Sequence, residues 1–157
     1  MENQLTVLSE SLDKKLQVLR EIQEYNKEQE QIFLADTANL DEFDAAIEEK
    51  GRLIEKLEKL DEGFESVYGS LAAELKGNRE KYVNQIKALQ DKIRRVTELS
   101  VSVQAQEQRN KKLVEQYFAK AHNNIRQERK SSKAAFNYYK NMNGGAVPQS
   151  HFMDSKK

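Results

Sequence analysis

The chain has 157 residues and a formal net charge of zero; 33% of its residues are charged, it has no cysteine, and its one proline is Pro148. Without cysteine it has neither a disulfide framework nor a thiolate metal site, which fits a reducing compartment, and the cytoplasm is the expected location. No run approaches the roughly 20 apolar residues of a membrane span, and the start of the chain lacks the basic and then apolar pattern of a secretory signal.

The first predicted element is a helix from Asn3 to about Asp36. Its apolar residues recur at steps of three and four, which places them on one helical face. They are Leu5, Leu8, Leu12, Leu16, Leu19, Ile22, Ile32 and Phe33. Between Ile22 and Ile32 this stripe is replaced by the polar residues Asn26 and Gln29 and by Tyr25. Polar residues in a packed seam cost stability but can fix its register.

A turn is expected between Asp36 and Asp41, where Thr37, Asn39 or Asp41 can cap the next helix. The second helix is predicted from about Leu40 to Lys76. Its stripe is Phe43, Ile47, Ile54, Leu57, Phe64, Leu71 and Leu75, widened by Leu53, Leu60 and Val67. Gly51, Gly63 and Gly69 interrupt this helix, where each costs up to about 1 kcal/mol against alanine, so we expect them to mark close contacts or bends.

Gly77 and Asn78 predict the second turn, because both residues tolerate the left-handed conformation that ends many helices. A third stripe follows from Asn78. It consists of Tyr82, Ile86, Leu89, Ile93, Val96 and Val103, then a polar gap at Gln106, Glu107 and Asn110, then Leu113, Val114, Tyr117 and Phe118. Whether this gap faces the polar gap of the first helix is open at this point, because the sequence does not fix the register between helices.

These elements predict an all-α fold: an elongated antiparallel three-helix bundle or coiled coil with a long third helix, over residues 1–142. Residues 143–157 have few apolar side chains and two adjacent glycines, which predicts a flexible tail. Residues 1–76 carry 9 basic and 19 acidic side chains, and residues 77–157 carry 17 basic and 7 acidic ones. Opposite charge favours packing the two halves side by side. A nucleic-acid partner for the basic half is the alternative.

No catalytic constellation is evident in the sequence. The only imidazoles, His122 and His151, have no second ligand at metal-binding spacing, so we expect both to be solvated. Acidic pairs such as Glu48 and Glu49 are typical of the wet face of a helix. We therefore expect a binding protein rather than an enzyme, with no metal and no cofactor.

The segment from Arg126 to Lys140 combines basic and aromatic residues and has three interpretations. In the first interpretation it is the end of the third helix, packed on its own bundle. In the second it takes up a partner helix, and in the third it contacts RNA or a membrane. A pure scaffold has no need of aromatic residues beyond its last core repeat, which separates the second interpretation from a self-associating coiled coil.

Two stretches resemble a known family. Residues 40–64 read LDEFDAAIEEKGRLIEKLEKLDEGF, and residues 102–113 read SVQAQEQRNKKL, followed by KSSKAAFNYY at 130–139. They are similar to the FlgN-type flagellar export chaperones and their FliT-like relatives, and the resemblance covers most of the chain. Glu-Lys-Leu repeats of this kind also occur in unrelated coiled coils.

The resemblance implies a cytoplasmic chaperone of type III export that binds the terminal helix of hook–filament junction proteins, keeps them unassembled and delivers them to the export apparatus. The family's C-terminal binding region maps here onto Val114, Tyr117, Phe118, Ile125, Phe136, Tyr139 and Met142. Three alternatives stay open: a FliT-like chaperone of the filament cap protein, a self-associating scaffold, and a homodimeric chaperone. Neither nucleic acid nor membrane insertion is expected.

Overall fold

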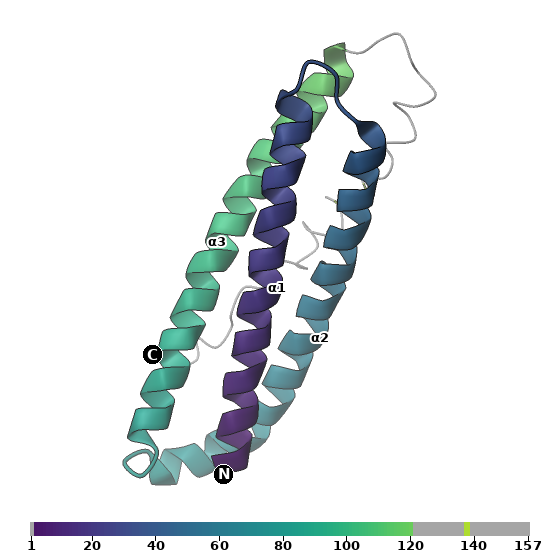
Figure 1. Cartoon of the computed structure of the whole chain (residues 1–157). Coiled ribbons are helices and arrows are strands. Elements are labelled where there is room, and N and C mark those ends of the chain that lie inside the picture. The colour runs from purple at the N-terminus through teal and green to yellow at the C-terminus, as the bar shows by residue number, and fades with distance from the viewer. Residues whose placement is uncertain (1, 121–136, 139–157) are drawn as a thin grey trace.

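A computed structural model describes residues 2–120 and 137–138 of the chain. It contains three long helices, α1 (Glu2–Leu34), α2 (Leu40–Asn78) and α3 (Val83–Lys120), and no strand among the described residues. The helices run up, down and up in an elongated bundle (Figure 1), so α1 and α3 are parallel and α2 is antiparallel to both. The predicted all-α three-helix bundle is confirmed, with helix bounds close to those expected.

The apolar stripe of α1 forms the centre of the core. Every predicted stripe residue of this helix is buried, and Leu19 and Ile22 have no exposed surface. Because α1 packs against both α2 and α3, its buried face is wide. In α2 and α3 the predicted stripes are buried along the middle of each helix, whereas Leu75, Tyr82 and Ile86 near the α2–α3 turn are only half-buried.

The turn between α1 and α2 forms as expected. Of the three candidate caps, Asn39 is the one used: its side-chain oxygen accepts a hydrogen bond of 3.2 Å from the backbone N–H of Glu42. Asp41 and Glu42 occupy the first turn of α2, where a negative charge is favoured by the helix dipole. The cap therefore fixes where α2 begins.

The second turn lies where it was predicted, but the reason given for it is wrong. The helix ends at Asn78, and the capping residue, Arg79, has right-handed φ and ψ values of −53° and −42°. No left-handed glycine is needed at Gly77. The side-chain N–H of Asn78 instead donates a 3.0 Å hydrogen bond to the carbonyl oxygen of Glu74, which satisfies one free acceptor at the helix end.

The glycines inside α2 do not mark close contacts, which was one of the two roles expected of them. A β-carbon added at Gly51, Gly63 or Gly69 would meet no atom within 4 Å. The cost of each glycine in the helix is therefore not offset by closer packing at that position.

The two oppositely charged halves of the chain lie side by side, with α1 next to α3. The ammonium group of Lys92 in α3 lies 2.9 Å from a carboxylate oxygen of Asp13 and 2.7 Å from the hydroxyl of Ser9, both in α1. Lys15 of α1 pairs with Asp61 of α2. Among the described residues, no helix is long and apolar enough to cross a membrane.

Replacement of the capping residue, Asn39→Ala, is expected to lower the free energy of unfolding by about 1 kcal/mol, because the N–H of Glu42 loses its acceptor. Urea denaturation followed by circular dichroism measures this difference. Thr37→Ala in the same turn is the matched control and should leave the midpoint nearly unchanged. Equal losses in the two variants would show that the cap has no special role.

Candidate partner-binding site

The second and third helices lie farther apart than the other two helix pairs. The backbones of α2 and α3 stay more than 8 Å apart, Cα to Cα, along their lengths, whereas α1 approaches both more closely. Figure 1 shows α1 placed between the two in the same way. We call the line along which side chains of α2 and α3 face one another the α2–α3 seam. Helices packed directly on one another have axes 8–10 Å apart. The lack of close Cα pairs shows that α2 and α3 are not packed directly on one another.

A buried polar layer crosses the seam at mid-length. The ammonium group of Lys50 in α2 lies 2.7 Å from Oε1 of Glu107 in α3, and it donates a 2.8 Å hydrogen bond to Oε1 of Gln29 in α1. The hydroxyl of Tyr138 donates a 2.8 Å hydrogen bond to Oε1 of Glu107, and its ring centroid is 4.3 Å from the Lys50 nitrogen. We refer to these four residues as the polar layer.

The polar layer is almost completely removed from water. Lys50 and Gln29 have no exposed surface, Glu107 is 1% exposed and Tyr138 is 6% exposed. Burial lowers the pKa of Lys50 below its ordinary value of 10.5, and the neighbouring Glu107 carboxylate opposes that shift without cancelling it. Such a pair is tolerated only when its remaining hydrogen-bonding groups also find partners. Gln29 and Tyr138 provide them.

The polar gaps of the first and third stripes lie opposite one another. Asn26 donates a 3.2 Å hydrogen bond to Oε1 of Gln106, and Asn110 donates a 3.0 Å bond to the backbone oxygen of Asn26. This settles the register that the sequence left open. The gaps coincide because α1 and α3 run in the same direction and start at the same end of the bundle.

Three of the predicted partner-binding residues lie in the described part of the chain, next to an aromatic cluster at the α1–α2 turn. Tyr117 packs edge-on against Phe33, with ring centroids 5.4 Å apart, and Phe33 packs in the same way on Phe43 at 4.8 Å. Phe118 lies 5.4 Å from Tyr117. Both Tyr117 and Phe118 are half-buried, so each keeps surface that a partner can reach.

The other predicted residues fall into two groups. Val114 is 5% exposed and belongs to the hydrophobic core. Ile125, Phe136, Tyr139 and Met142 lie outside the described residues, as do His122, His151 and the predicted tail. Among the described residues, no three His, Asp or Glu side chains come together as metal ligands.

Sequence reasoning missed the polar layer, although part of its signal was present. Lys50 lies three residues after Ile47 and four before Ile54, so it occupies a stripe position of α2. Glu107 holds the equivalent position after Val103 in α3. A lysine and a glutamate, one on each of two stripes, indicate a buried ion pair. Nothing in the sequence indicated Tyr138 as their third partner.

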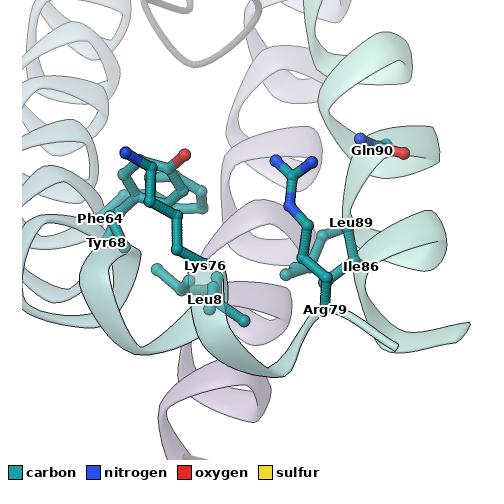
Figure 2. A pocket seen from close by; sticks show the side chains of 10 residues that line it. Leu8, Phe64, Tyr68, Lys76, Arg79, Ile86, Leu89 and Gln90 are labelled. Carbon is teal, nitrogen blue, oxygen red and sulfur yellow. The ribbon is translucent and has the colours of Figure 1, made fainter. Parts of the chain in front are cut away.

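An end pocket lies on the same seam beside the α2–α3 turn. It is a cavity of about 290 Å³ between α1, α2 and α3. Its floor consists of the buried residues Leu8, Phe64 and Leu89, and half-buried Tyr68 and Ile86 line its sides. Figure 2 shows these side chains converging from the three helices. The seam therefore has an apolar site at each end and the polar layer between them.

Removal of one charge from the polar layer is expected to cost far more than removal of both. Glu107→Leu leaves the buried ammonium of Lys50 without its counter-charge and should lower the free energy of unfolding by about 3–5 kcal/mol. The double variant Lys50→Met/Glu107→Leu should recover most of that loss. A double-mutant cycle measured by urea denaturation tests this, and simple addition of the two single effects would contradict the coupling.

The lowered pKa of Lys50 also predicts a pH dependence. Between that pKa and 10.5, the unfolded chain still holds a proton on Lys50 that the folded chain has lost, so the free energy of unfolding rises with pH across this range. The reference is the Lys50→Met/Glu107→Leu variant, which lacks both members of the ion pair but keeps every other titrating group of the chain. The free energy of unfolding of wild type minus that of the variant should rise with pH until pH passes 10.5. A difference that shrinks as pH rises would mean that Glu107 raises the pKa instead.

Comparison of the chain with protein-family models, with curated proteins and with solved structures gave no match. The fold class therefore stands on the helices themselves. The assignment of a partner has to be argued from the seam, the polar layer and the aromatic cluster.

Proposed function

We propose that this protein is a cytoplasmic chaperone of flagellar type III export. It binds the terminal helix of hook–filament junction proteins, keeps them unassembled and delivers them to the export apparatus. The proposal joins the resemblance in residues 40–64, 102–113 and 130–139 to the geometry of the seam. It involves no catalysis and no cofactor.

The observation that carries the proposal is the separation of α2 and α3. A four-helix bundle has four corners around one core, and α1, α2 and α3 fill three of them. The fourth position lies over the α2–α3 seam. At mid-length this fourth position is occupied by Tyr138, a buried residue with helical backbone that contacts Lys50 and Glu107. This position therefore suits the apolar face of a helix, as in other helix-in-groove complexes.

The mixed character of the seam suits a chaperone that must release its client. Tyr117 and Phe118 offer half-buried aromatic surface at one end, and the end pocket offers apolar surface at the other. Covering a client's apolar helix prevents that helix from associating elsewhere. The polar layer in the middle gives a client helix little apolar area to bury, which keeps the complex reversible.

The test is a binding assay with purified full-length chain and each candidate partner: a hook–filament junction protein, the filament cap protein and the chain itself. We expect a complex with the junction protein. Phe118→Ala should weaken it at least about tenfold, because truncation of an aromatic side chain that anchors an interface commonly costs more than 1.4 kcal/mol of binding free energy. Isothermal titration measures the affinity.

Val101→Ala is the matched control, because Val101 is an apolar residue of the same helix that is 60% exposed. It should bind like wild type. A complex with the cap protein alone would favour the FliT-like alternative, and self-association alone would favour the scaffold.

A further inference from the structure

We propose that the end pocket is a carboxylate site that holds the last turn of a partner's helix by its C-terminus. Apolar side chains of that turn fill the pocket, and the free α-carboxylate lies between Lys76 and Arg79. This inference rests on the proposed function in one respect only, which is that the occupant is a partner's terminal helix.

The charged residues that line the pocket are all positively charged. Lys76 and Arg79 both line the cavity, and no acidic residue does. Within the described residues neither cation forms an ion pair, although other exposed cations such as Arg52 and Arg94 pair with acids on their own helix. Figure 2 shows the side chain of Lys76 rising from the last turn of α2 and that of Arg79 from the following turn, on opposite sides of the pocket. Two unpaired cations over an apolar cavity match a ligand that is apolar and ends in an anion.

The chemistry also selects which end of a helix can enter. The C-terminus of a helix carries the negative end of its dipole as well as the free carboxylate, and both are stabilised by nearby cations. An N-terminus would bring a positive dipole end and an ammonium group against Lys76 and Arg79. A helix lying in the seam must therefore have its C-terminus at the α2–α3 turn.

The pocket is far enough along the seam from the polar layer, where Tyr138 packs, to take the last turns of a helix. Phe64 follows Lys50 by 14 residues in α2, which is about 21 Å of helix. The pocket and the polar layer are thus separated by about four turns of the same groove. The last turns of a partner helix can therefore fill the pocket without displacing Tyr138 from the polar layer.

The direct test uses N-acetyl-leucyl-leucine, which supplies two apolar side chains and one carboxylate, added to the isotope-labelled full-length protein. Nuclear magnetic resonance should show saturable shifts of the backbone amides of residues 76–86. The C-terminal amide of the same dipeptide should bind at least about tenfold more weakly, because charge-assisted hydrogen bonds are lost. If both forms bind equally, or if no shift is seen at about 10 mM, well above a weak Kd of roughly 1 mM, the proposal is wrong.

Two variants separate charge from shape. Lys76→Gln/Arg79→Gln should abolish the preference for the acid, whereas Lys56→Gln/Lys59→Gln, the same charge change at exposed positions of α2 away from the pocket, should keep it. Ala72→Phe should fill the cavity and weaken both forms. Shifts of the same amides on dilution of the protein without any dipeptide would assign the pocket to a second copy and overturn the proposal.

The inference and the proposed function can fail separately. If a junction protein is bound, but its C-terminal peptide binds equally well as acid and as amide, the carboxylate site is wrong and the chaperone proposal stands. If the dipeptide acid binds selectively but no junction protein does, the site stands and the identity of the client is wrong.

Discussion

The ion pair between Lys50 and Glu107 is the interaction on which the arrangement of the three helices depends. Both charges are inside the bundle, where an unpaired ion costs several kcal/mol. A slip of either helix by one turn would separate them, so the pair fixes how α2 and α3 are aligned even though their backbones do not approach closely. Gln29 completes the coordination of the Lys50 ammonium from α1. One buried contact thus ties all three helices to a single register.

The same contact divides the α2–α3 seam into apolar and polar parts. A continuous apolar seam would bind any amphipathic helix and would also promote self-association. Here the apolar surface is split, with Tyr117 and Phe118 near one end and the end pocket near the other. The polar layer lies between them and is satisfied by groups from four segments of the chain. The arrangement that stabilises the register is therefore also the one that limits what can lie in the seam.

Much of the fold follows from the sequence, and the limits of that prediction have physical causes. The stripe of α1 and the cap at Asn39 are local properties, so periodicity and capping chemistry predict them correctly. Asn26 and Gln106 face one another only because of the direction and starting point of two helices that are distant in sequence. No local sequence pattern gives this information. The expectations from the sequence did not include Lys50 in the core. Its position on the stripe was informative, but only a partner on another helix makes its burial tolerable.

The polar layer also bears on how a partner helix would be selected. Tyr138 supplies both a hydroxyl for Glu107 and a ring face for the Lys50 ammonium. A helix that replaced it with purely apolar side chains would leave a buried carboxylate oxygen with one donor fewer, at a cost of about 1–3 kcal/mol. A helix with a donor at that position would avoid this cost. For a partner helix of the kind we propose, specificity would thus come from a penalty at the centre of the seam and affinity from the apolar contacts at its ends.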